Sequence, residues 1–168
     1  MAAVLVTPTR ADGHRAVLRG LLYRRQRRLH WRDENDRRRA HLITALAALR
    51  LSGVVVVASG LDPKRQERAR RKCMERLLWE LGARGVGEVV FESRGRGLDE
   101  DDRRVVDVMR VQNSVSPQLR VRWQEAEREP LIWIPDIVAG AASLATAGQE
   151  RFWKELGPEL AIERFELN

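Results

Sequence analysis

Two carboxylates stand at positions where an α/β protein often holds its ligands. Glu92 ends the short apolar run EVVFE (88–92), and the carboxyl ends of strands in an open α/β sheet form the usual ligand edge. Asp136 is the one charged residue in LIWIPDIVAGAASLAT (131–146). Carboxylates brought together repel unless a divalent cation holds them, and carboxylate-bound Mg²⁺ or Mn²⁺ is the usual apparatus for phosphodiester hydrolysis. Glu92 and Asp136 are therefore predicted to be catalytic metal ligands.

Asp136 has a second interpretation, which the sequence leaves open. Pro135 favours a helix start, and the macrodipole stabilises an acid in the first helical turn, so Asp136 could simply cap a buried helix. Its place after Pro135 suits the first or second helical position better than the cap itself. Carboxylates of Glu92 and Asp136 within roughly 4 to 7 Å would favour the metal site.

Other acids could complete such a metal site. Asp33 and Glu34 close the segment RRLHWRDE (27–34) and are predicted as additional ligands. Asp99 and Asp102 would share one helix face at a spacing of i and i+3. They are also typical first-turn acids, and we prefer that interpretation for them.

The basic charge belongs to the first half of the chain. Residues 1–90 carry 20 Lys and Arg against 9 Asp and Glu, a balance of +11, whereas residues 91–168 carry 11 against 15, a balance of −4. A basic surface for a polyanion would need this asymmetry. A solvated helix surface with the arginine bias of a GC-rich genome would look similar, and the two interpretations weigh about evenly.

Nucleic-acid contacts are predicted in two segments. The glycine-rich run SRGRG (93–97) would present Arg94 and Arg96 to phosphate, unless it is only a flexible connection. Arg27, Arg28 and His30 stand in a polar stretch beside Trp31. His30 is the one histidine considered for function, because His14 and His41 fall on ordinary helices as surface or boundary residues. Cys73 lies on an apolar helix stripe and is interpreted as a core residue rather than a nucleophile.

Strands and helices alternate along most of the chain, which predicts a single α/β domain over residues 1–168. Its core would span about 1–147, followed by a C-terminal helix and strand in 149–168. We expect a mixed or largely parallel central sheet with flanking helices. Predicted caps are Asp12, Asn35 or Asp33, and Asp62. Strands are expected at 2–7, 54–59, 88–92, 119–123 and 161–167, and helices at 12–22, 36–51, 62–82, 99–109, 135–146 and 149–156.

The order of motifs resembles a poorly characterised group of RNase H-like proteins, over about residues 1–146. The matching segments are RRLHWRDE, VVVV, ERLLWEL, VVFESR, RRVVDVMR and LIWIPDIVAGAAS. In this group, acids on the first strand, on a later strand and at the start of the last core helix are taken to bind metal. The resemblance assigns the later positions to Glu92 and Asp136 and implies that the His30 segment lines the active site.

The group usually opens with a strand that carries Asp-Glu-Ser-Gly, and this chain has none. AAVLVT (2–7) resembles the second strand of the group instead. Either the start site is placed too late, or the chain is a shortened relative that lacks one metal ligand. A sheet edge left unpaired by the missing strand predicts a homodimer.

The sequence therefore predicts an RNase H-like nuclease dependent on Mg²⁺ or Mn²⁺, or an inactive member that lacks a ligand. The alternative is a non-catalytic α/β domain that binds nucleic acid or a protein, and a third is a small-ligand domain whose charge is compositional. One cysteine and the lack of a signal-like start or a long apolar run predict a cytoplasmic protein without membrane contact.

Overall fold

The computed structural model describes residues 1–60 and 63–166 as an α/β protein, which confirms the predicted fold class. The chain divides into two compact units. Unit 1 comprises Met1, Val56–Glu125 and the chain from Glu163 onward, and unit 2 comprises Ala2–Val55 and Ala126–Ile162. The RNase H-like arrangement and the single domain stay predictions.

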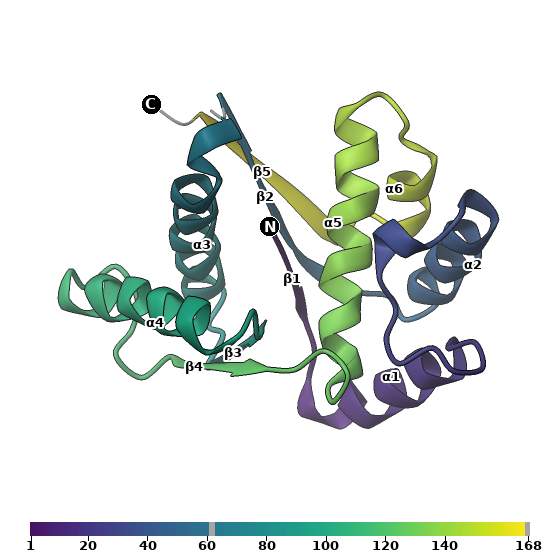
Figure 1. The fold of residues 1–168 in the computed structure, drawn as a ribbon, viewed down its shortest axis with the longest axis horizontal. Helices are drawn as coiled ribbons and strands as arrows, with labels where there is room; N and C mark the ends of the chain where they lie inside the picture. The colour runs from purple at the N-terminus through teal and green to yellow at the C-terminus, as the bar shows by residue number, and fades with distance from the viewer. Residues whose placement is uncertain (61–62, 167–168) are drawn as a thin grey trace. The chain divides into compact units, whose positions relative to one another are not determined.

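The described strands form two sheets, coloured along the chain in Figure 1. In the three-stranded sheet the order is β1-β2-β5, so β2, the VVVV strand, is the middle strand as expected. β1 runs antiparallel to β2, and β3 pairs with β4 in parallel, from Glu88 opposite Arg120 to Glu92 opposite Gln124. The bounds are β1 (Ala2–Leu5), β2 (Ser52–Ser59), β3 (Glu88–Glu92), β4 (Arg120–Gln124) and β5 (Leu160–Glu166).

Unit 2 is built around α5 (Trp133–Thr146), the apolar segment singled out in the sequence. This helix packs against β1, α2 and α6, and Figure 1 shows α6 beside it. Burial explains its composition, because Ile134, Ile137, Val138 and Ala141 are all 0% exposed. The other helical elements of the unit are α1 (Pro8–Gly20), the 3₁₀ helix η1 (Trp31–Asp33), α2 (Asp36–Ala47), the 3₁₀ helix η3 (Pro130–Ile132) and α6 (Arg151–Leu156).

Two glycines of unit 2 permit close approaches that no other residue would allow. A Cβ at Gly53 would overlap the carbonyl oxygen of Ala3 on the neighbouring strand. A Cβ at Gly140 in α5 would overlap the ring of Trp31. Gly140 therefore leaves the space in which the indole of Trp31 packs against α5.

Unit 1 packs α3 (Gln66–Ala83) against α4 (Arg96–Val111), and the 3₁₀ helix η2 (Pro63–Arg65) precedes α3. The predicted apolar stripe of α3 is buried, and Cys73 is a free core cysteine as expected. The cap predicted at Asp62 lies outside the described residues. Across residues 1–60 and 63–166, no helix combines the length and apolar character needed to cross a membrane.

Several helix ends differ from the prediction. α1 starts at Pro8 after Thr7, so Asp12 is not its cap; Asp12 lies inside the helix, 2.9 Å from the Arg15 guanidinium. α5 starts at Trp133, two residues before Pro135, because a proline in the first turn gives up an N–H that has no helical acceptor.

One predicted cap is confirmed, whereas the start of α4 and the burial of His14 differ from the prediction. Asn35 does cap α2, where its side chain accepts a hydrogen bond of 3.0 Å from the Arg38 amide. α4 begins at Arg96, inside the segment 93–97 that was predicted as a loop. His14 is buried, with 8% of its surface exposed, and is not the surface or boundary residue expected from its helix.

Candidate functional site

Asp136 lies in the first turn of α5 and binds the segment that precedes α2. Its Oδ2 accepts a hydrogen bond of 2.7 Å from the Trp31 amide and lies 2.9 Å from His30 Nδ1. Its Oδ1 receives no hydrogen bond from any described residue. The side chains of His30 and Asp136 are each 31% exposed. The carboxylate is thus fixed through one oxygen, while the other remains available, and it makes none of the capping hydrogen bonds that the sequence suggested.

Packing of one indole holds the His30 segment in place. Trp31 is buried, meets Phe152 edge to face with 5.4 Å between ring centroids, and fits over Gly140. The guanidinium of Arg39 lies 4.8 Å from the indole centroid, and its Nε and Nη2 each donate to the Trp31 carbonyl at 3.2 Å. The contacts of Trp31 therefore fix the backbone next to His30 and hold its side chain near Asp136.

The hydrogen bond to Asp136 orients the imidazole of His30. An ionised carboxylate only accepts hydrogen bonds, so His30 Nδ1 must be the donor to Asp136. The neutral imidazole then carries its lone pair on Nε2. An acid that holds a histidine in this tautomer is the orienting element of many hydrolytic sites. His30 could serve there as a general base or acid.

Asp33 and Glu34, the other predicted ligands, have different environments. Asp33 is exposed in η1. Glu34 is buried; its Oε1 accepts 2.8 Å from Gln26 Nε2, and its Oε2 lies 3.7 Å from Arg38 Nε. Within the described residues, no three His, Cys, Asp or Glu side chains gather as a group that could hold a metal ion. The metal role of Asp33 and Glu34 stays a prediction.

Residues 21–30, here called the arginine loop, lead directly into the His30–Asp136 pair. A tight turn opens the loop, where the Gln26 amide donates to the Tyr23 carbonyl at 2.9 Å. Gln26 Oε1 accepts from the Tyr23 amide at 3.1 Å, which closes the turn from the other side. Arg25, at its corner, has a φ of 75°, in the left-handed region. The exposed arginines of the loop are Arg24, Arg25, Arg27 and Arg28.

Arg38 of α2 anchors this loop from beneath. It is buried, donates from Nη2 to the Leu21 carbonyl, and lies 3.9 Å from the ring centroid of Tyr23. Arg27 and Arg28 were predicted from the sequence, whereas Tyr23 and Arg38 were not. A signal for Tyr23 was present in YRRQRR (23–28), where an aromatic residue stands among arginines. Arg27 lies 3.3 Å from Glu127, with both side chains exposed.

Glu92 ends β3 in unit 1, whereas Asp136 belongs to unit 2. A metal shared by these two carboxylates therefore stays a prediction. Arg94, predicted to bind phosphate, binds Glu67 through Nη2 at 2.6 Å and Nη1 at 3.2 Å. This hydrogen-bonded pair raises the pKa of Arg94 and lowers the pKa of Glu67. Arg96 is 93% exposed, with Nε 3.2 Å from Glu100.

Asp99 is a first-turn acid of α4, as expected, whereas Asp102 lies further along the helix, and both are buried. Asp99 accepts from Ser93 Oγ at 2.6 Å and from the Arg94 amide at 2.8 Å. Asp102 Oδ2 lies 2.7 Å from Arg70 Nη2. Burial lowers the pKa of Arg70, and the attraction of Asp102 partly offsets this effect. Both acids fasten the start of α4 to neighbouring segments of unit 1.

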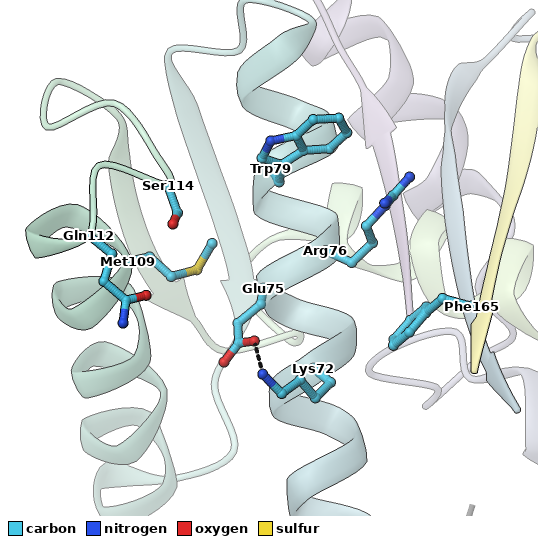
Figure 2. A pocket seen from close by; sticks show the side chains of 8 residues that line it. All are labelled: Lys72, Glu75, Arg76, Trp79, Met109, Gln112, Ser114 and Phe165. Carbon is cyan, nitrogen blue, oxygen red and sulfur yellow. Dashed lines mark hydrogen bonds and ion pairs between the residues drawn. The ribbon is translucent and has the colours of Figure 1, made fainter. Parts of the chain in front are cut away.

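A shallow cavity of about 400 Å³ lies on unit 1. Figure 2 shows side chains of α3 in its middle, with Phe165 of β5 on one side. Met109 of α4, and Gln112 and Ser114, which follow that helix, lie on the other side. Trp79 is 51% exposed, and the Arg76 guanidinium lies 4.9 Å from its ring centroid. The cavity cations already have acids: Lys72 lies 2.7 Å from Glu75, and Arg76 lies 2.7 Å from the acid of the next helical turn, Glu80.

Comparisons with protein-family models, curated proteins and solved structures return no match to this chain.

Proposed function

We propose that this chain is a divalent-metal-dependent nuclease of RNase H-like class, which hydrolyses phosphodiester bonds at Asp136. The observation that carries the proposal is the carboxylate itself. Two donors hold Oδ2, while Oδ1 accepts no hydrogen bond from the described residues. Metal-binding carboxylates are typically held by such outer hydrogen bonds. The arginine loop, which carries four exposed guanidinium groups, runs into the same pair and suits a polyanionic substrate.

The residues present are compatible with Mg²⁺ or Mn²⁺. Mg²⁺ commonly keeps several waters and is held by one or two carboxylates together with substrate phosphates, so a cluster of three protein ligands is not required. Asp136 would hold the ion through Oδ1. A bound ion would supply a more acidic water and stabilise charge on the phosphoryl oxygens.

The chain's own residues would then do three things. The arginine loop binds the phosphates of the substrate. Trp31 and Arg39 keep the His30 segment rigid, which preserves the geometry of the pair. His30 takes up or delivers a proton at Nε2 while Asp136 holds Nδ1.

End-labelled single-stranded and duplex oligonucleotides, incubated with Mn²⁺, Mg²⁺ or EDTA, test the proposal. Wild-type protein should cleave only with metal, and Asp136→Asn should lower the rate about a hundredfold or more. Asn is a matched change, because its amide oxygen still accepts from Trp31. Asp12→Asn is the control, because Asp12 is an exposed acid of α1 to which no metal role is assigned, and this variant should stay within about twofold of wild type. Free Mn²⁺ measured by electron paramagnetic resonance should show binding that Asp136→Asn loses. Cleavage that survives EDTA or the Asp136 substitution would refute the proposal.

The second candidate is a non-catalytic domain that binds nucleic acid. It is supported by the exposed arginines of unit 2, which serve binding whether or not chemistry follows. Binding that weakens steeply with salt, without cleavage under any metal condition, would select it. In either case the free, buried Cys73 suits the reducing cytoplasm that we propose as the location.

A further inference from the structure

We infer that Tyr23 is a base-stacking platform, so that the arginine loop takes single-stranded rather than duplex nucleic acid. This inference rests on the proposed nucleic-acid function and names its substrate class. The loop combines an exposed aromatic ring with adjacent cations, which is the combination that single-strand binding sites use.

One face of the Tyr23 ring is already occupied, and the remainder is open. Tyr23 is 62% exposed. The Arg38 guanidinium covers one face at 3.9 Å from the ring centroid, so a base would have to stack on the opposite face. A nucleobase on that face would complete a stack of base, phenol and guanidinium. Arginine planes and aromatic rings are the partners on which unpaired bases stack.

The platform is held before any ligand arrives. Arg38 is only 5% exposed and donates to the carbonyl of Leu21, two residues before the ring. Gln26 donates to the buried Glu34 at 2.8 Å and accepts from the Tyr23 amide at 3.1 Å. A ring fixed in this way loses little conformational entropy when a base binds.

The turn presents two arginines that have no acid among the described residues. Neither Arg24 nor Arg25 forms an ion pair there. Arg25 adopts a φ of 75°, a conformation in which glycine or asparagine is less strained. The Arg25 side chain is also exposed. Its reach and charge suit a phosphate next to the stacked base.

The preference for single strands follows from which bases the Tyr23 ring can stack on. In a duplex each base face is covered by the neighbouring base pairs, so a loop aromatic finds only backbone and groove. An unpaired strand offers bases whose faces are free. Cations alone would bind both forms, and the aromatic ring adds affinity only for the single strand.

Trp79 supplies a matched control on unit 1. It is 51% exposed and also has an arginine, Arg76, 4.9 Å from its ring centroid. The cations of that cavity are paired with Glu75 and Glu80 at 2.7 Å, unlike Arg24 and Arg25. An effect common to any exposed aromatic would appear at both residues.

Fluorescence anisotropy in EDTA, with a labelled oligothymidine and a duplex of the same length, tests the inference without any cleavage. Tyr23→Ala and Tyr23→Leu should each weaken single-strand binding about tenfold and change duplex binding less than about twofold. Tyr23→Trp should keep single-strand affinity. Trp79→Ala should leave both affinities unchanged. Arg25→Gly should weaken both substrates together, because it removes a charge and no aromatic face.

Equal losses for single strand and duplex, or no loss in Tyr23→Ala and Tyr23→Leu, would overturn the inference. So would a loss in Trp79→Ala as large as that in Tyr23→Ala. If Tyr23→Ala lowers the melting temperature, the comparison of Leu with Trp at position 23 decides between packing and stacking. Because metal is absent, a failure of the proposed hydrolysis leaves these results unchanged, and unaffected binding in the Tyr23 variants would leave the hydrolysis proposal standing.

Discussion

His30 Nδ1 lies 2.9 Å from Asp136 Oδ2, although 106 positions separate the two residues in the chain. The Trp31 amide donates to the same oxygen at 2.7 Å. The acid at the start of α5 therefore fastens the segment ahead of α2, and this single oxygen defines where the imidazole stands.

Substitutions at His30 should separate support of Asp136 from proton transfer. Asn can donate its amide N–H where Nδ1 did but has no second ring nitrogen, so His30→Asn should keep stability and lose hydrolysis. His30→Phe should lose hydrolysis and also lower the free energy of unfolding by about 1 kcal/mol, because it removes a partly exposed hydrogen bond to a carboxylate. Urea unfolding and initial rates of cleavage measure the two effects. Equal activity in His30→Asn and wild type would exclude a role for Nε2.

Gly140→Ala should destabilise the protein, although alanine is the better helix former by about 1 kcal/mol. The new methyl group would overlap the Trp31 ring, which is buried, and overpacking of this kind typically costs about 1 to 3 kcal/mol. Gly13→Ala in α1 is the matched control, because its Cβ would meet open space. That variant should be stabilised instead. Equal shifts of the unfolding midpoint in both variants would contradict the packing of Trp31 on α5.

Arg38→Met should cost about 3 kcal/mol, because it removes one partner of a buried pair and leaves Glu34 uncompensated. The substitution also leaves the Leu21 carbonyl without its hydrogen bond from Arg38 and removes the guanidinium from the Tyr23 ring. Single-strand binding should therefore fall together with stability. Arg37→Met, an exposed neighbour in the same turn of α2, should change stability by less than about 0.5 kcal/mol. Denaturant titration and anisotropy on both variants make the comparison. Loss of binding in Arg37→Met as large as in Arg38→Met would show that charge alone matters.

Stability should decrease below neutral pH because of His14. Burial lowers the pKa of His14 from its usual 6.5, and the charge of Arg10 lowers it further. Between that lowered pKa and 6.5 the unfolded chain binds more protons than the folded chain. The free energy of unfolding should thus be full above about pH 6.5 and fall as the pH drops through the lowered folded value.

Urea unfolding from about pH 5 to pH 8 measures this contribution, and His14→Gln should flatten the curve in that window. Arg10→Ala should flatten it partly, because one of the two causes is removed. A His14→Gln curve that falls as steeply as wild type would contradict the assignment.

The edge of β1 predicts self-association. In the described sheet β1 is a terminal strand, with β2 on one side. Unpaired edges invite a strand from another chain, and Ala2–Leu5 has no charged residue to discourage it. Sedimentation velocity over a range of concentrations should show a dimer, and Val4→Lys should shift it toward monomer. A monomer at every concentration would count against the predicted homodimer.

Local patterns in the sequence predicted the elements well. EVVFE (88–92) is β3 to the residue, Asn35 caps α2, and the spacing of Cys73 and its neighbours marks the buried face of α3. Each of these follows from alternation, helical period or a cap, which depend on residues close in the chain. The start of α5 was missed because Pro135 is equally acceptable at several first-turn positions.

The candidate site was only partly predictable. Asp136 and His30 were both selected from the sequence, but their mutual contact was not, because it depends on how distant segments pack. Asp102 was misjudged for the same reason: its partner Arg70 lies 32 positions away, on another helix. Arg38 looked like one of three consecutive arginines, and only burial distinguishes it from Arg37.

The packing of Trp31 against Phe152 and Gly140 affects the order in which parts of the chain fold. The indole meets Phe152 and Gly140, so it can be enclosed only after the first quarter and the last quarter of the sequence have come together. Contacts that close such long loops form late and slowly compared with local helices. Burial of Trp31, followed by its fluorescence in a single-tryptophan background, should therefore mark a late folding event. The His30–Asp136 pair becomes complete in that same event, so partly folded chains carry no pair.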